Sequence, residues 1–388
     1  MKKWIISILV VILLGGCSLP NIKKDNEVIQ ETADQEEESI IPYIQISDSY
    51  YPTVLEYKES KTRGMVVSNL HSKYDVAEFE KGLMRVATNN FSTDKYYFQE
   101  GQILSSEVVN SWLNRKYTEE QLKEREMTAE QNLGLNPVND GSGSVEEQNT
   151  KNPIYLAHVL EHDYLVKEDK KLRLGGIVIG LALNSVHYYQ KEKYGDTFEV
   201  AIAHKELAEQ GKKMAVEIYE RLRSMEEVGD DIPITIALFE QRSKNAVTPG
   251  NFFAYAHGSK KGSSLGDWKS VNEKTILFPS SEAEKDFKKE SDPFLAFKDE
   301  IEKYFSNYIG VIGRGFYVDD QLHKLSIEIP LQMYGEAELI GFTQWAASLV
   351  MEYFPQYFNV EVDIHSMEGA EALIIKNAGD KEPFVHIY

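Results

Sequence analysis

The stretch "LRLGGIVIGLALNS", residues 172–185, decides the fold class. Its apolar residues form a nearly continuous run without alternation, which predicts a strand buried on both faces. The next apolar pattern, at 203–225, has its apolar residues three or four apart and predicts a helix with one packed face. "IPITIALFEQ", at 232–241, predicts a second buried strand. Strand, helix and strand in this order predict a β-α-β unit.

The same pattern returns near the end of the chain. "KLSIEIPLQMY" (324–334) and "FNVEVDIH" (358–365) predict strands, and "AELIGFTQWAASLVMEYF" (337–354) predicts the helix between them. Upstream, predicted strands at 252–256 and 274–282 could match predicted strands at 64–70 and 96–104. We therefore expect a mixed α/β (α+β) fold with two related halves from an internal duplication, behind a lipidated flexible tether. The expected halves are 43–243 and 248–388, with the break near Pro249 and Gly250.

Between these units the sequence predicts further helices at 76–91, 107–115 and 118–125, and a mobile loop at 135–153.

The N-terminus has the layout of a secretory signal peptide, which we place at residues 1–16. Lys2 and Lys3 precede an apolar stretch, and about 13 to 14 residues separate Lys3 from Cys17, too few for a permanent membrane span. Leu14, Gly15 and Gly16 directly precede Cys17, and this order resembles a bacterial lipobox. The small residues would let the extended chain enter the signal peptidase.

In lipoproteins with that box the cysteine sulfur is joined to diacylglycerol and becomes the new N-terminus. We therefore expect a diacylglyceryl anchor on Cys17, the single cysteine of the chain. Two acyl chains suffice for stable anchoring. The mature protein is expected on the extracytoplasmic face of the cell membrane, with residues 17–42 as an acidic, flexible tether.

Composition excludes some partners. The chain has 62 acidic and 42 basic residues, a net charge of −20, which repels phosphate backbones and argues against nucleic acid. With one cysteine, no disulfide can form within the chain.

Several stretches resemble the CamS lipoproteins, known as sex-pheromone precursors of low-GC Gram-positive bacteria. They are the lipobox at Leu14 to Cys17, the acidic tether, "GGIVIGLALNSVHYYQKEKYG" (175–195), "GDWKSVNEKTILFPSSE" (266–282) and "VIGRGFYVDDQLHKLSIEIP" (311–330). The resemblance covers nearly the whole chain.

The resemblance implies that any pheromone comes from the discarded signal sequence. The corresponding heptapeptide is "VVILLGG", that is Val10, Val11, Ile12, Leu13, Leu14, Gly15 and Gly16. It is uncharged and could bind an apolar peptide receptor on recipient cells. Its two terminal glycines depart from the alanine-type ending of the active peptide, and ordinary signal-peptide debris is the alternative. The resemblance assigns no activity to the folded halves.

One string suggests an enzyme. "HVLEH" places His158, Glu161 and His162 in the H-x-x-E-H order of zinc hydrolases, where two histidines on one helix face bind metal and the glutamate activates water. The motif requires a helix over 154–166, and no third ligand follows at a diagnostic spacing. Two surface histidines on an amphipathic turn are the alternative. We expect no enzyme activity, no cofactor and no metal.

Aromatic residues near strand ends suggest another alternative, a surface lipoprotein that binds a solute, a peptide or a cell-wall ligand. They are Tyr188, Tyr189, Tyr194, Phe252, Phe253, Tyr255, Phe316 and Tyr317.

Overall fold

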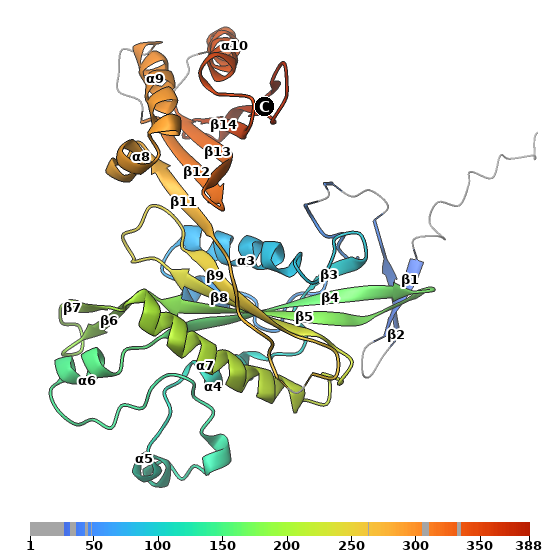
Figure 1. Ribbon diagram of the computed structural model, residues 1–388, viewed down its shortest axis with the longest axis vertical. Helices are drawn as coiled ribbons and strands as arrows, with labels where there is room; N and C mark the ends of the chain where they lie inside the picture. The colour runs from blue at the N-terminus through green and yellow to red at the C-terminus, as the bar shows by residue number, and fades with distance from the viewer. Residues whose placement is uncertain are drawn as a thin grey trace, which may run out of the picture.

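The computed structural model describes residues 27–31, 36–42, 46–47, 49–262, 264–304, 310–331 and 335–388. The predicted signal peptide, the lipobox and Cys17 lie outside this part of the chain. Two large sheets follow one another along the sequence and form two α/β halves (Figure 1). No helix in the described ranges has the length and apolar character needed to cross a membrane.

The first sheet has the order β3-β4-β5-β8-β9-β10. Its strands are β3 (Tyr96–Glu100), β4 (Leu156–Glu168), β5 (Lys171–Asn184), β8 (Ile234–Gln241), β9 (Asn251–Gly258) and β10 (Lys269–Ser270). β5 and β8 are parallel, and the other neighbours in this order are antiparallel. Two more strands, β1 (Glu27–Glu31) and β2 (Glu36–Ile40), join at the first residues of β5.

Helices cover both faces of this sheet. On one face α7 (His204–Arg223), the connection from β5 to β8, packs its apolar stripe against alternate residues of β5 such as Ile177 and Leu181. On the other face α3 (Lys73–Ala87) packs against Val178 and Ala182. This double coverage explains why β5 reads as an uninterrupted apolar run.

Two glycines of β5 let aromatic rings lie directly on its backbone. A Cβ added at Gly176 would lie 2.1 Å from an atom of the Phe91 ring, and one added at Gly180 would lie 2.9 Å from the ring of Phe79. Both rings are buried.

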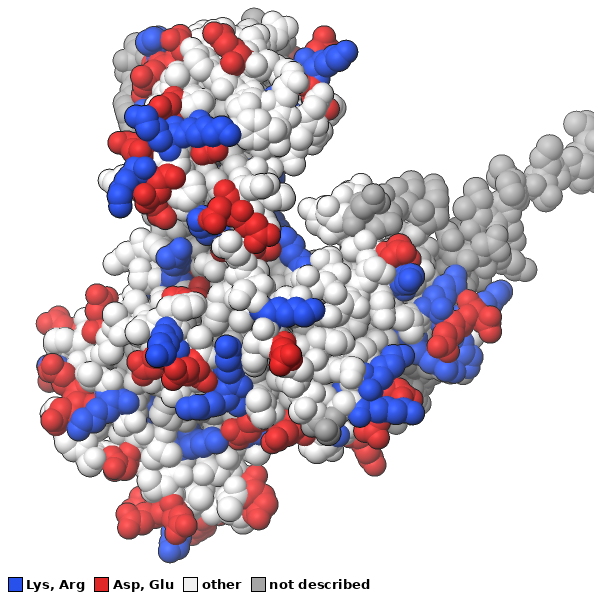
Figure 2. Space-filling view, viewed as in Figure 1, with Lys and Arg blue, Asp and Glu red and all other residues white. Residues whose placement is uncertain are grey.

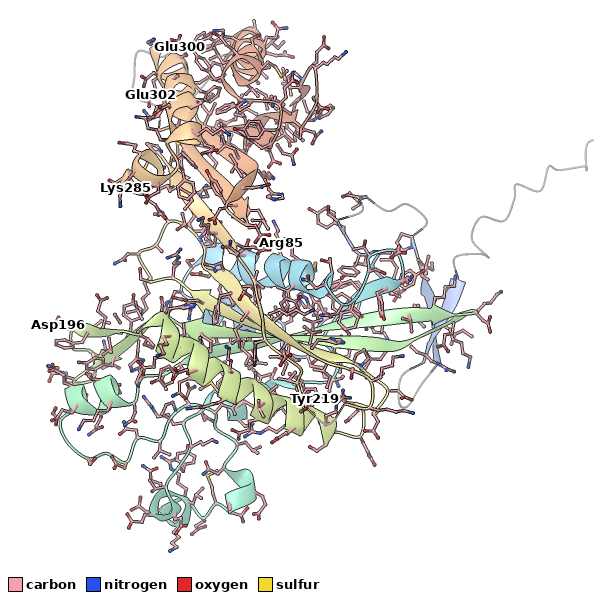
Figure 3. All side chains as sticks on the ribbon, in the orientation of Figure 1. Arg85, Asp196, Tyr219, Lys285, Glu300 and Glu302 are labelled. Carbon is pink, nitrogen blue, oxygen red and sulfur yellow. The ribbon has the colours of Figure 1, made fainter. Side chains whose placement is uncertain are left out.

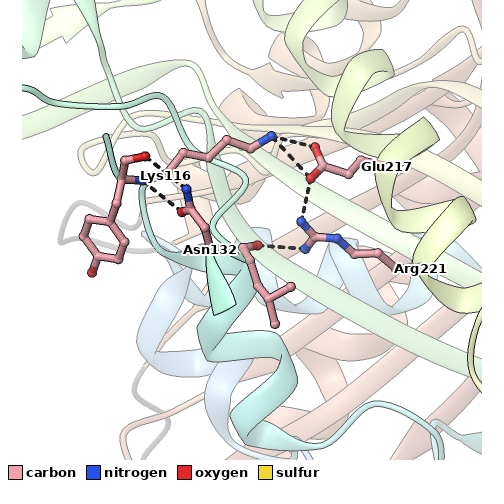
Figure 4. Close-up of polar contacts among 6 residues, drawn as sticks. Lys116, Asn132, Glu217 and Arg221 are labelled. Carbon is pink, nitrogen blue, oxygen red and sulfur yellow. Dashed lines mark hydrogen bonds and ion pairs between the residues drawn. The ribbon is translucent and has the colours of Figure 1, made fainter. Parts of the chain in front are cut away.

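The connection from β3 to β4 is long and carries α4 (Ser106–Leu113), α5 (Glu119–Glu124), a short 3-10 helix (Ala129–Gln131) and α6 (Val145–Lys151). Polar contacts tie it to α7 (Figure 4). Glu217 of α7 accepts hydrogen bonds from Lys116 at 2.9 Å and from Arg221 at 2.5 Å. Arg221 also donates to the carbonyl oxygen of Leu133 at 2.7 Å.

The second sheet has the order β11-β12-β13-β14-β15-β16. Its strands are β11 (Glu273–Phe278), β12 (Ile312–Val318), β13 (Gln321–Pro330), β14 (Asn359–His365), β15 (Ala370–Lys376) and β16 (Phe384–Ile387). β13 and β14 are parallel and α10 (Glu336–Tyr353) connects them, while the other pairs are antiparallel. This order and these directions match the first sheet pair by pair, which confirms the predicted two related α/β halves.

The second half differs in its layers. α8 (Ser281–Asp286) and α9 (Lys288–Tyr304) connect β11 to β12, and α9 and α10 contribute to one apolar core. Burial alternates along β13 and β14, so the other face of this sheet is partly exposed.

Arg85 of α3 links the two halves (Figure 3). Its guanidinium lies 2.8 Å from the carboxylate of Glu273 on β11, pairs with Glu78 of its own helix, and stacks 4.6 Å from the ring centroid of Phe316. Elsewhere on the face shown in Figure 2, acidic and basic side chains are interspersed.

The structure corrects three expectations. The segment 64–70 is not a strand but contains the helix α2 (Met65–Asn69), whose i, i+4 pair Val66 and Leu70 is buried. The expected flexible tether at 17–42 includes β1 and β2. The strand expected at 252–256 to begin the second half is β9, which pairs with β8. Loop 242–250 therefore joins two strands of the first sheet, and the change of sheet falls between Ser270 and Glu273.

The close packing of the Phe91 ring on Gly176 predicts that a larger residue at position 176 destabilises the fold. Gly176→Ala should lower the free energy of unfolding by about 1 to 3 kcal/mol, because the added methyl group forces a buried ring to move. Urea denaturation of the purified chain measures the change. Gly229→Ala is the matched control, since a Cβ at Gly229 meets nothing within 4 Å. Equal stability of the two variants would contradict the packing argument.

Candidate functional site

The residues of the zinc-like string lie on a strand. His158, Glu161 and His162 belong to β4, which pairs with β3 and β5 and is buried on both faces. Successive side chains of a strand point to opposite faces, so the two imidazoles share one face and the Glu161 carboxylate lies on the other. The expected helix over 154–166 is wrong, and this arrangement cannot bring Glu161 to a metal held by both histidines.

The imidazoles line a pocket of about 200 Å³, called here the histidine pocket, together with Glu80, Glu100 and Arg63, and part of Glu161 also borders it. Both histidines are buried, which also excludes the alternative of two surface histidines. Burial lowers the pKa of His158 to about 4 and that of His162 to about 3, so both rings are neutral at pH 7.

Hydrogen bonds leave part of each ring unpaired. The Asn69 amide lies 3.1 Å from Nδ1 of His158, whereas Nε2 of His158 and Nδ1 of His162 have no partner among the described residues. Within the same ranges, no three His, Cys, Asp or Glu side chains are grouped in a way that could hold a metal ion.

On the opposite face of β4, Glu161 and Asp163 form a buried carboxyl pair. Glu161 accepts backbone hydrogen bonds from Ile103 at 2.9 Å and Leu104 at 2.7 Å, and Asp163 accepts one from Gln102 at 2.9 Å. Burial, reinforced by the charge of Glu161, raises the pKa of Asp163 well above its usual range. The raised pKa keeps Asp163 protonated beside Glu161, although its Oδ1 has no hydrogen-bond partner among the described residues. Through its backbone hydrogen bonds the pair anchors the 102–104 segment.

A larger depression lies at the carboxyl ends of the parallel strands β5 and β8. We call it the groove; its volume is about 680 Å³, and its polar lining includes Asn69, Asn110, Asn114, Asn184, Tyr188 and Lys244. Ligands of open α/β sheets commonly bind outside the carboxyl ends of strands, where the connections diverge. The groove is thus placed where this type of sheet can form a binding site.

The floor of the groove is a hydrogen-bonded network. Gln241, the last residue of β8, donates to the side-chain oxygen of Asn184 at 2.5 Å and accepts from the backbone N–H of His71 at 3.0 Å. Asn184, the last residue of β5, also donates to the carbonyl oxygen of Ile154 at 2.9 Å. The network joins the ends of both strands to the wall formed by α2 and the chain that follows it.

Of the aromatic residues suggested by the sequence, Tyr188 lies in the groove and the set does not form one site. Phe252, Tyr255 and Tyr317 are core residues, Phe316 contacts Arg85, and Tyr194 is exposed on the hairpin of β6 (Val186–Gln190) and β7 (Thr197–Ala201). The sequence patterns did not identify the asparagines of the groove lining or Lys244 as site residues. Asn184 and Gln241 end two predicted parallel strands, and that position is the signal that could have located the groove.

The carboxyl pair predicts an unusual pH dependence. Asp163 keeps its proton in the folded state and loses it in the unfolded chain above about pH 4, so this group makes stability fall as the pH rises toward its raised folded pKa. Asp163→Asn should keep the hydrogen bond from Gln102 and is neutral beside Glu161 without binding a proton. The variant should therefore be more stable than the parent at pH 7 and show a flatter profile.

Denaturant unfolding at pH 4, 6 and 8 measures this effect. Asp196→Asn, at an exposed position on the β6–β7 hairpin, is the control for loss of one negative charge. A destabilised Asp163→Asn variant at pH 7 would show that Asp163 is ionised in the fold.

Comparisons with known proteins agree with this fold. Residues 57–382 match the family model described as the CamS sex pheromone cAM373 precursor. A crystal structure of a sex pheromone precursor from Lactobacillus salivarius subsp. salivarius UCC118 is 32% identical, with a TM-score of 0.80 over 90% of this chain and 99% of that one. No curated protein gives a significant match.

A second solved structure, the C-terminal domain of the sex pheromone staph-cAM373 precursor from Staphylococcus aureus, is 37% identical. Its TM-score is 0.71, and the match covers 82% of this chain and 98% of that one. The family match spans most of the described sequence, including both sheets from β3 to β15. The chain therefore belongs to the CamS sex pheromone precursor family.

Proposed function

We propose that the mature chain is a lipoprotein, anchored on the extracytoplasmic face of the cell membrane by a diacylglyceryl group on Cys17. The observation that carries this proposal is the order Leu14, Gly15, Gly16, Cys17 after a short apolar run. Membership of a pheromone-precursor family supports it. Signal peptidase would cut before Cys17, and the two acyl chains would hold the protein on the membrane.

This anchor would orient the folded part. β1 begins ten residues after Cys17, so its first residue lies within about 35 Å of the anchor. β1 pairs with Lys171 and Leu172 at the start of β5 (Figure 1). The groove lies at Asn184, the last residue of β5. A 14-residue strand is roughly 45 Å long. The groove would thus be presented away from the membrane.

Mass spectrometry of the N-terminal peptide from the membrane fraction tests the anchor. We expect a diacylated Cys17 as the first residue, and a Cys17→Ser variant should keep its signal peptide and carry no lipid. An unmodified thiol in a chain that retains Met1 would overturn the proposal. The folded halves serve as an internal control, because their peptides should be identical in both samples.

We further propose that the signal peptide supplies a pheromone, the heptapeptide Val10 to Gly16. After signal peptidase cleavage, an intramembrane protease would cut upstream of Val10 and release "VVILLGG". The peptide has no charged side chain, so it can partition into membranes and fill an apolar receptor site on a recipient cell. The related solved structures are those of sex pheromone precursors, which supports this role.

Synthetic "VVILLGG" should induce a mating response in suitable recipients. Replacing Leu13 by Asp should abolish the response, because an ionised carboxylate in an apolar site costs several kcal/mol. Deleting residues 43–388 while keeping the signal peptide should leave the response intact. A peptide that stays silent across the concentration range of peptide pheromones would reject this role and leave the anchored folded part as the functional product.

The groove favours a second role, a surface ligand-binding lipoprotein. Its volume of about 680 Å³ lies within the range of known ligand sites, and its polar groups converge at the ends of β5 and β8. If the groove has this role, a ligand should bind saturably to the protein, and substitutions in the groove should weaken that binding.

A further inference from the structure

The groove is unusual for this protein because no carboxylate lines it. The whole chain has a net charge of −20, yet the charged side chain in the lining is Lys244. Burial lowers the pKa of His71 and lowers that of His187 to about 4, so both lining histidines are neutral at pH 7. An anionic group, which the net charge of the chain repels, is therefore tolerated in the groove.

Two amides in the groove are available to a ligand. Asn110 and Asn114 lie four residues apart at the end of α4, so their side chains share a face, and both are exposed. Neither side chain makes a hydrogen bond within the described part of the protein. By contrast, the Asn69 and Asn184 amides are already bonded to His158 and Gln241. Each free amide offers a donor and an acceptor, the pair that a peptide backbone also presents.

Lys244 is held in place beside Tyr188, another residue of the groove lining. Its backbone N–H donates to the Tyr188 hydroxyl at 3.1 Å, and its ammonium lies 4.2 Å from the centroid of the Tyr188 ring. Tyr188 in turn packs edge-to-face on His71 at 5.2 Å. The ammonium forms no ion pair with a described acidic residue, so it can receive a carboxylate.

We propose that the groove binds the C-terminal end of an extended peptide, with the terminal carboxylate at Lys244 and backbone amides at Asn110 and Asn114. The proposal rests on the ligand-binding role of the groove and names its ligand class. Amide side chains match the alternating N–H and C=O groups of an extended backbone, and a fixed cation matches a chain terminus. A glycan fits less well, since its many hydroxyl donors are best satisfied by carboxylate acceptors, which this lining lacks.

Isothermal titration calorimetry of the full mature chain in detergent tests the proposal. The probes are pentaalanine with a free C-terminal carboxylate, the same peptide with a C-terminal amide, and N-acetylchitotriose. We expect the free acid to bind about tenfold more tightly than the amide, because only the acid makes a charge-assisted contact. Lys244→Met should remove this difference, and Asn110→Ala/Asn114→Ala should weaken both peptides about fivefold or more.

Lys213→Met, at an exposed position on α7, is the matched control and should bind like the parent. Circular dichroism checks that the groove variants are folded. If the Lys244→Met variant still binds the free-acid peptide more tightly than the amide, recognition of the carboxylate by Lys244 is overturned. Saturable binding of N-acetylchitotriose without peptide binding would overturn the peptide class but retain a binding role for the groove. Binding of neither probe would reject both.

Discussion

The packing of β5 between two helical layers is the constraint on which the first half depends. This strand pairs with β4, β8 and β1, and its side chains alternate between the core under α7 and the core under α3. Gly176 and Gly180 bring the rings of Phe91 and Phe79 onto its backbone. Because both faces are closed, a polar group of this sheet is costly unless it lies at a strand end or is hydrogen-bonded, and His158 and His162 of β4 each keep one ring nitrogen without a partner among the described residues.

Both outcomes are found on the neighbouring strands. Glu161 and Asp163 are buried in the middle of β4, where both accept hydrogen bonds from backbone N–H groups and burial raises the pKa of Asp163. Asn184, which ends β5, lines the groove, and Gln241, which ends β8, is buried and hydrogen-bonded to it. Similar polar groups are therefore enclosed within the sheet on β4 and border the groove at the end of β5, according to their position along the strand.

The two halves share a strand order but differ in the connection between their first two strands. In the first half this connection, from β3 to β4, supplies α4 and with it Asn110 and Asn114 of the groove. In the second half the corresponding connection supplies α8 and α9, whose residues Ala283, Phe294 and Phe297 are buried in the core. A connection can diverge in this way without disturbing the pairing of the sheet, which explains why the groove belongs to the first half. Arg85 joins the halves on the side of the sheet covered by α3.

The sequence by itself determined the buried β-α-β units, because continuous apolar runs and helical stripes at 172–241 and 324–365 reflect local periodicity. The sequence also contains the Ser144 and Glu147 capping box, which begins α6 inside the expected loop at 135–153. Tertiary structure decided the rest. "HVLEH" has no strand-like alternation because β4 is buried on both faces, so its period could not distinguish strand from helix. The sheet to which β9 belongs and the meeting of Asn114, Asn184 and Lys244 in the groove depend on pairing between distant segments, which local sequence patterns do not encode.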